Sequence, residues 1–142
     1  MATRPEHLGV PEMDTEHLEI AALFESFAGI ADGELAQALQ RADDAVREHF
    51  AHEEALMERH KVPVLFCHIA QHKKLLTEFD AARAECDRQD FYALRRRLTV
   101  IIPELILAHV ASVDRVTSMW ILGQFERDDL DGLRLPVPDM AN

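Results

Sequence analysis

Several histidines in this 142-residue chain occupy positions where the pattern calls for buried apolar residues. Apolar residues recur at spacings of three and four, as on the buried faces of packed helices, and five of the eight histidines follow this pattern together with one glutamate. These six residues are His17, His49, Glu53, His68, His72 and His109. A buried imidazole or carboxylate without a partner costs on the order of 1–3 kcal/mol. Because all six need a partner at once, a shared metal centre is the simplest interpretation.

The spacing of these residues predicts how they meet. His49 and Glu53 are four residues apart, as are His68 and His72, so each pair points from one face of a helix toward one place. Two imidazoles at this spacing could ligate a single ion at about 2.0–2.1 Å. Asp114 follows His109 by five residues, which predicts a carboxylate rotated well around the helix from that histidine and suited to reaching a second metal.

The complete inventory, with His17 from the first helix, is five histidines and two carboxylates. These are too many ligands for one ion with an open position, and they fit two adjacent ions bridged by the carboxylates. Imidazole with carboxylate suits iron, and ligand type alone also allows zinc, copper or nickel. The Glu-x-x-His pairs of ferritin-like di-iron proteins are missing from the pattern, so this nitrogen-rich set indicates a different kind of centre.

Four helices would position these residues. We expect the first to be capped by Asp14 or Thr15 and to end near 29–33; the others span about 34–60, 64–88 and 91–122. Pro103 lies inside the fourth pattern, where it either kinks the helix or starts a new segment. The prediction is an all-α fold, an up-down-up-down antiparallel four-helix bundle. It comprises a domain over 1–122 with an irregular arm at 1–12, and a polar C-terminal tail at 123–142.

Composition limits the partners. Lys+Arg number 15 and Asp+Glu 26, and the formal net charge of −11 argues against nucleic acid or an anionic membrane surface. No apolar stretch is long enough to span a bilayer, and the N-terminal residues lack the apolar core of a secretory signal. The two cysteines show no paired spacing, which is typical of a reducing compartment. We therefore expect a soluble, cytoplasmic protein.

Four segments within residues 8–120 together resemble the bacterial single-domain hemerythrins of the HHE cation-binding family. They are LGVPEMDTEH, HFAHEEALM, VPVLFCHIAQH and HVASVD, in this order. The resemblance implies a non-haem centre of two iron ions with an oxo or hydroxo bridge. By this analogy His68, His72 and His109 hold one iron, His17 and His49 hold the other, and Glu53 and Asp114 bridge both.

The resemblance also implies a dioxygen pocket beside the second iron, which has an open position. The family usually carries a tryptophan four residues before the fourth-helix histidine, and this place is Leu105 here. Ile106 and Val110 would be neighbouring wall residues, and Phe50 would shield the irons. The expected function is reversible dioxygen binding for storage, transport or scavenging, with dioxygen as the partner and no catalytic residue.

Two alternatives remain open at this stage. One is an oxygen, redox or iron sensor that signals to a partner protein, for which the tail at 123–142 is the candidate contact. The other is a di-iron enzyme acting on peroxide or nitric oxide, although no acid–base catalyst is evident beside the predicted site. His7, His52 and His60 fall outside the buried pattern and are expected to face solvent, and Glu54 is expected to be a surface charge.

Overall fold

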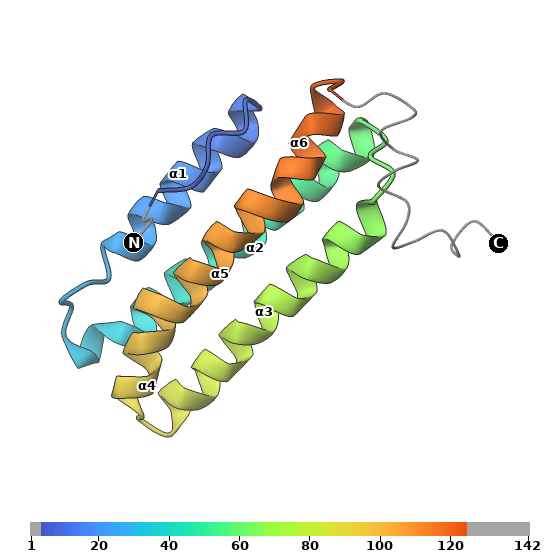
Figure 1. The fold of residues 1–142 in the computed structure, drawn as a ribbon. Coiled ribbons are helices and arrows are strands. Elements are labelled where there is room, and N and C mark those ends of the chain that lie inside the picture. Colours follow the sequence, from blue (N-terminus) through green and yellow to red (C-terminus); the bar gives the residue numbers. More distant parts are fainter. Residues whose placement is uncertain (1–3, 125–142) are drawn as a thin grey trace.

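A computed structural model describes residues 4–124, and within that range it contains helices and no strand. The long helices are α1 (Pro11–Glu25), α2 (Leu35–Arg59) and α3 (Leu65–Asp87). A short 3₁₀ turn, η1 (Asp32–Glu34), precedes α2. The fourth rod runs through α4 (Phe91–Arg96), η2 (Arg97–Ile101), α5 (Ile102–His109), η3 (Val110–Asp114) and α6 (Arg115–Ile121). Successive rods run in opposite directions (Figure 1), which confirms the predicted all-α antiparallel four-helix bundle.

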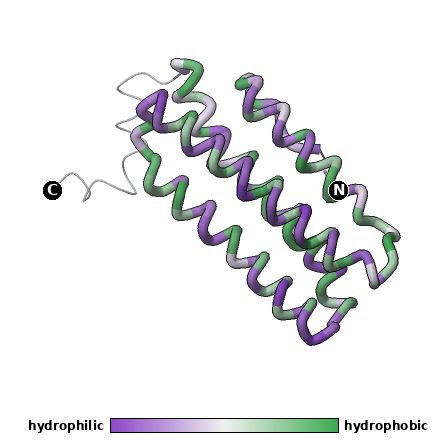
Figure 2. Tube along the Cα trace, turned by 180° about the vertical axis from the view of Figure 1, so that it is seen from behind, coloured by the Kyte–Doolittle hydropathy of each residue, from purple (hydrophilic) through white to green (hydrophobic). Residues whose placement is uncertain are grey.

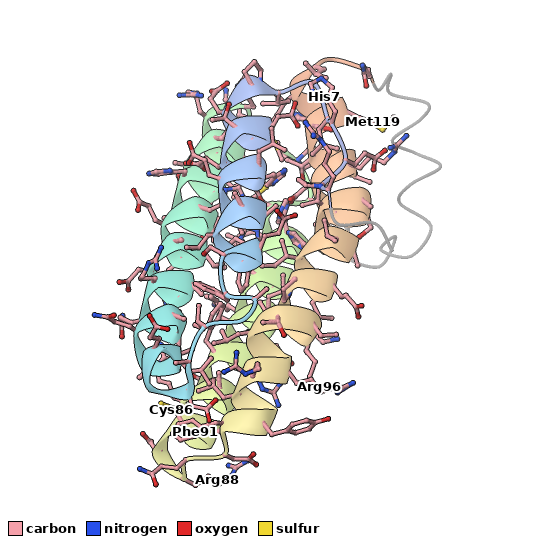
Figure 3. The ribbon with its side chains drawn as sticks, turned by 90° about the vertical axis from the view of Figure 1, so that its left-hand side faces the viewer. His7, Cys86, Arg88, Phe91, Arg96 and Met119 are labelled. Atoms are coloured by element: carbon pink, nitrogen blue, oxygen red, sulfur yellow. The ribbon has the colours of Figure 1, made fainter. Side chains whose placement is uncertain are left out.

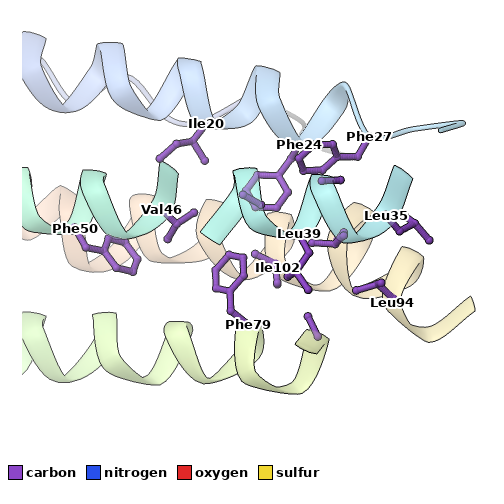
Figure 4. Packing of buried hydrophobic residues seen from close by; sticks show 14 residues of the cluster. Ile20, Phe24, Phe27, Leu35, Leu39, Val46, Phe50, Phe79, Leu94 and Ile102 are labelled. Atoms are coloured by element: carbon purple, nitrogen blue, oxygen red, sulfur yellow. The ribbon is translucent and has the colours of Figure 1, made fainter. Parts of the chain in front are cut away.

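The bundle is held together by apolar side chains that each rod contributes at helical spacing. Polar and apolar residues alternate along every helix (Figure 2), so one face of each helix can be buried while the other stays in water. The main core lies toward the α3–α4 end and contains Phe27, Leu35, Phe79, Leu94 and Leu98, all almost completely buried (Figure 4). Burying each of these side chains contributes about 1.5–3 kcal/mol. A smaller apolar cluster of Val10, Met13 and Leu56 lies elsewhere in the bundle.

The first helix begins earlier than the sequence pattern predicted. Pro11 occupies the first turn of α1, where its fixed φ and missing N–H are tolerated. Asp14 is consequently inside the helix rather than at its cap, and its carboxylate accepts hydrogen bonds from the backbone N–H groups of Leu8 (2.8 Å) and Gly9 (2.9 Å). Asp14 therefore fastens the preceding arm to the helix. The predicted tail at 123–142 lies almost entirely outside the described residues.

The fourth rod is continuous through Pro103, without the break that the sequence allowed. The π-helical turn η2 precedes the proline, and the N–H of Ile102 donates to the carbonyl of Arg97, five residues back. Such a turn readjusts the hydrogen-bond ladder where a proline N–H is missing. A second π-helical turn, η3, follows His109. No helix of the described residues combines the length and apolar character needed to cross a membrane.

Candidate metal centre

All seven residues of the predicted site lie together inside the bundle, and each of the four rods contributes at least one. Their nitrogen and oxygen atoms form two groups, in each of which the atoms lie within 4.8 Å of one another. The first group contains Glu53, His68, His72, His109 and Asp114. The second contains His17, His49, Glu53 and Asp114. The groups share their two carboxylates, so Glu53 and Asp114 lie between a set of three imidazoles and a set of two.

Glu53 takes its central position from the helical spacing in α2 and α3. His49 precedes it by one helical turn, and His49 Nε2 lies 3.0 Å from Glu53 Oε2. His68 and His72 project from successive turns of α3, and their Nε2 atoms lie 2.8 and 3.0 Å from Glu53 Oε1. One oxygen of Glu53 thus faces the α3 histidines and the other faces His49, as a bridging carboxylate would.

Asp114 is placed by the π-helical turn η3, and here the sequence interpretation was wrong. Five residues at ordinary helical spacing would rotate Asp114 away from His109, but the wider π turn accommodates the additional residue. Asp114 Oδ1 therefore lies 3.0 Å from His109 Nε2 and 2.9 Å from His68 Nε2, while Oδ2 lies 3.0 Å from His17 Nε2. Asp114 faces both groups from the same helix face as His109.

Several of these buried atoms have no hydrogen-bond partner among the described residues. They are both ring nitrogens of His17, Oε2 of Glu53, Nε2 of His109 and both carboxylate oxygens of Asp114. The separations of about 3 Å place nitrogens and oxygens side by side, but their directions are not those of hydrogen bonds. Buried polar atoms are normally satisfied. Of those named here, His17 Nε2 and the atoms of Glu53, His109 and Asp114 face one another, which fits a metal cation bound between them.

The electrostatics of the cluster also favour bound positive charge. Burial lowers the pKa of His17 and of His68, but contacts with Asp114 and Glu53 outweigh this effect and raise each pKa to about 9. Burial raises the pKa of Glu53, but the surrounding imidazoles, including His17 and His49, outweigh it and bring that pKa well below its ordinary value. Without a metal, protons on the imidazoles balance the two carboxylates. Metal cations could replace those protons.

Three further side chains contact the Nδ1 atoms of site histidines, on the side of each ring that faces away from the two carboxylates. The sequence pattern did not indicate them. Glu16 Oε1 lies 2.9 Å from His49 Nδ1, Glu54 Oε2 lies 2.7 Å from His72 Nδ1, and the Thr117 hydroxyl lies 2.7 Å from His68 Nδ1. Glu54 was expected to be a surface charge and is instead partly buried against His72. Such contacts fix ring orientation and direct Nε2 inward. Thr117 follows Asp114 by three residues, a spacing that could have identified it.

An apolar cavity of about 270 Å³ reaches the centre from one side, between α1 and the fourth rod. His17 lines it, together with Ile106 and Val110, two of the predicted pocket residues. Leu105, the third wall residue predicted from the sequence, is 40% exposed and is not among the lining residues. Its side chain points outward because the rotation of the fourth rod directs Ile106 inward instead. Leu105 is therefore not a wall residue of this cavity.

Phe50, the remaining predicted pocket residue, lies against the other side of the cluster. Its ring stacks on His72, with ring centroids 3.8 Å apart and planes inclined by 4°. It is 4% exposed and belongs to the main apolar core. Phe50 therefore separates His72 from solvent and joins the polar cluster to the apolar packing. It does not line the cavity beside His17.

The three histidines outside the buried pattern are exposed, as predicted: His7, His52 and His60. His7 lies near Met119, at the end of the bundle opposite Cys86 and Phe91 (Figure 3). Both cysteines of the chain, Cys67 and Cys86, are free thiols. The histidines of the chain thus divide into five buried around two carboxylates and three at the surface.

Comparison with known proteins places this arrangement in a family. A family model described as the hemerythrin HHE cation binding domain matches residues 8–121. A bacteriohemerythrin of Ralstonia nicotianae (strain ATCC BAA-1114 / GMI1000) is 31% identical over 115 residues, which cover 81% of this chain and 83% of that protein. No solved structure matches the chain. With its buried histidine and carboxylate cluster in a four-helix bundle, the chain belongs to the hemerythrin HHE cation-binding family.

Proposed function

We propose that this protein binds dioxygen reversibly at a centre of two iron ions with an oxo or hydroxo bridge, for oxygen storage, transport or scavenging. The observation that carries the proposal is the division of seven buried residues into two groups that share Glu53 and Asp114. Two carboxylates common to two imidazole sets are what a pair of adjacent ions requires. Membership of the hemerythrin family favours this binding function over catalysis.

In this proposal the two iron positions have different numbers of histidine ligands. One iron takes its three terminal nitrogens from His68, His72 and His109. The other has only two terminal nitrogens, from His17 and His49, and Glu53 and Asp114 bridge the two positions. Imidazole and carboxylate together suit iron. The position with fewer nitrogens therefore has room for a small ligand, and it is the position on the His17 side, where the apolar cavity arrives.

The surroundings of the open position suit a small uncharged gas. When bound, the pair of iron ions supplies the two electrons that dioxygen takes up and later returns. The cavity walls at Ile20, Phe24, Ile106 and Val110 offer no proton donor and exclude water. Exclusion of water and protons keeps the dioxygen that has taken up these electrons from being protonated and leaving as hydrogen peroxide. This is the property that separates reversible binding from turnover.

The proposal is tested by loading the metal-stripped protein anaerobically with ferrous iron and then adding dioxygen. We expect two iron ions per chain and a visible absorption band that appears with dioxygen and fades when dioxygen is removed. Immediate, irreversible conversion to the ferric form would contradict reversible binding and favour the sensor alternative. Sustained consumption of peroxide or nitric oxide by the loaded protein would favour the enzyme alternative.

A further inference from the structure

A second cleft approaches the metal centre from a different side, and its chemistry is unlike that of the apolar cavity. It has a volume of about 600 Å³ and lies between α1 and α2. The site residues His49 and Glu53 line it, whereas His17 is the site residue that lines the apolar cavity. The group that contains His17 and His49 can therefore be reached by two separate routes.

Carboxylates accumulate along this α1–α2 cleft. Glu12, Glu16 and Glu19 line it from successive turns of α1. A smaller adjoining cleft of about 230 Å³ shares Glu16, Glu19 and His49 with it and adds Glu48 from α2. Two side chains that line the cleft can carry positive charge. Arg59 lies 3.2 Å from Glu12 at one end, and the contact with Glu16 raises the pKa of His52. The side chain of Glu12 remains 63% exposed, so its carboxylate is accessible to ions from solvent.

The acidic surface leads inward to a buried carboxylate. Glu16 is the intermediate point, since its two oxygens lie 2.9 Å from His49 Nδ1 and 2.6 Å from His52 Nδ1, and its side chain is 28% exposed. Glu53 is the inner end: it lines the cleft, is 2% exposed, and its Oε2 atom has no hydrogen-bond partner among the described residues. A cation moving along this cleft would find carboxylate oxygens at its mouth, along its length and at its inner end.

We infer that metal cations enter and leave the centre through the α1–α2 cleft, and that the uncharged gas uses the apolar cavity. This inference rests on the proposed function, because it concerns how the same centre is loaded. A hydrated divalent cation is attracted by the acidic cleft and loses its water ligands to oxygen atoms in steps. The apolar cavity has carboxylates only at its exposed rim, from Glu25 and Glu104. The residues between this rim and His17, such as Ile20, Ile106 and Val110, are apolar, so that route carries a large desolvation cost.

A matched pair of double variants separates the two routes. Glu12→Gln with Glu19→Gln removes two charges from the acidic cleft without touching a predicted ligand. Glu25→Gln with Glu104→Gln removes two charges from the rim of the apolar cavity and serves as the control. All four side chains are exposed, so neither double variant disturbs packing. The readout is the rate at which the full-length, metal-stripped protein takes ferrous ions from a coloured chelator under anaerobic conditions at low ionic strength.

We expect the cleft variant to load about three- to tenfold more slowly than the unaltered chain and still reach two ions, with the difference shrinking as salt is added. The control should load at the unaltered rate. Release from the loaded protein to excess chelator should slow in the cleft variant as well, because one passage serves both directions. This second measurement does not require the stripped protein to stay folded.

Equal rates in all three proteins, with two ions bound in each, would overturn the inferred route and leave the proposed function intact. Slower loading in the control alone would assign the passage to the apolar cavity and overturn the inference as well. Failure of the unaltered chain to bind iron would instead overturn the proposed function. The two failures are thus distinguished by the iron content of the unaltered chain.

Discussion

The Nε2 atom of His109 lies 3.0 Å from the Oδ1 atom of Asp114, although five residues separate the two along the fourth rod. In a regular α-helix residues that far apart point in directions more than a quarter turn from each other. The π-helical turn η3 (Val110–Asp114) removes this difference by taking one additional residue into a single turn. The position of Asp114 therefore depends on a local irregularity of the helix and not on the ordinary 3.6-residue period.

This relationship predicts the effect of deleting a residue. Removing Ser112, which is exposed, leaves Asp114 four residues after His109, so an ordinary α turn keeps both on one face. We expect this variant to retain two iron ions. Removing the exposed Ala70 shortens the regular turn between His68 and His72 and should reduce iron content by at least half. Iron content by elemental analysis checks both, and equal losses in the two deletions would contradict the role given to η3.

The sequence predicted α2 and α3 more accurately than the fourth rod. Buried stripes of apolar residues and the break at Pro63 located α2 and α3 to within one or two residues, because a helical period repeats over many turns. The π-helical turns could not be predicted from that period, since they interrupt it. They explain why Pro103 leaves the rod continuous and why Leu105 points outward.

The second prediction compares the loss of a buried histidine with the loss of an exposed one. His72→Ala removes a residue with 1% exposure from the group around Glu53, so we expect loss of at least one iron ion per chain. His52→Ala removes an exposed imidazole that is absent from both groups and should leave two ions bound. Iron content and the visible spectrum are the measurements. Equal losses in the two variants would refute the ligand assignment.

The third prediction concerns Glu54, which positions His72 rather than facing the centre itself. Glu54→Ala removes the partner of His72 Nδ1, and we expect iron affinity to fall about 10- to 100-fold, as for other residues that orient a metal-binding histidine. Glu54→Gln keeps an acceptor oxygen and should restore part of the affinity. Glu58→Gln, at an exposed position of the same helix, is the control. Competition with a chelator measures all three, and unchanged affinity in Glu54→Ala would exclude a positioning role.

The fourth prediction concerns the pH dependence of the metal-stripped protein. The pKa values of His17 and His68 are raised to about 9 in the fold, above the ordinary 6.5, so their protonation stabilises the folded state fully below pH 6.5. That contribution is lost as the pH rises through 9. The lowered pKa values keep Glu53 and Asp114 ionised throughout this range. The free energy of unfolding should fall between pH 6.5 and 9, whereas the loaded protein should show a weaker dependence.

Denaturant titrations at several pH values test this expectation directly. The same interval should show release of protons when ferrous ions are added to the stripped protein, because the metal replaces protons on the imidazoles. A stripped protein that becomes more stable as the pH rises from 6.5 to 9 would contradict the charge balance described for the centre.

The fifth prediction concerns the apolar cavity beside His17. Ala21 lines the cavity, whereas the neighbouring Ala22 is exposed and does not. Ala21→Leu places three additional carbon atoms in the space of about 270 Å³, so we expect dioxygen association to slow several-fold while iron content stays at two per chain. Ala22→Leu is the matched control and should associate at the unaltered rate. Stopped-flow absorbance measures the rates, and identical rates would show that the cavity is not the path of the gas.

The residues that orient the site histidines could not be predicted from the sequence. Glu16 and Glu54 each adjoin a predicted ligand in the chain, yet acidic residues are common on exposed helix faces and give no periodic signal. Only the side-by-side packing of α1 with α2, and of α2 with α3, brings their carboxylates to His49 and His72. Contacts between rods depend on rotation and register, which the pattern within one rod does not specify.

The polar cluster is a layer between the main apolar core and the smaller apolar cluster. Along α1, His17 lies between Met13 of the smaller cluster and Ile20 of the main core. Along α2, Glu53 lies between Phe50 of the main core and Leu56 of the smaller cluster. The larger apolar layer contains residues of all four rods and none of the seven site residues. We therefore expect the rods to pack against one another without bound metal, so that the ligands are already close together when an ion binds. Folding of the bundle and binding of iron would then be separable steps.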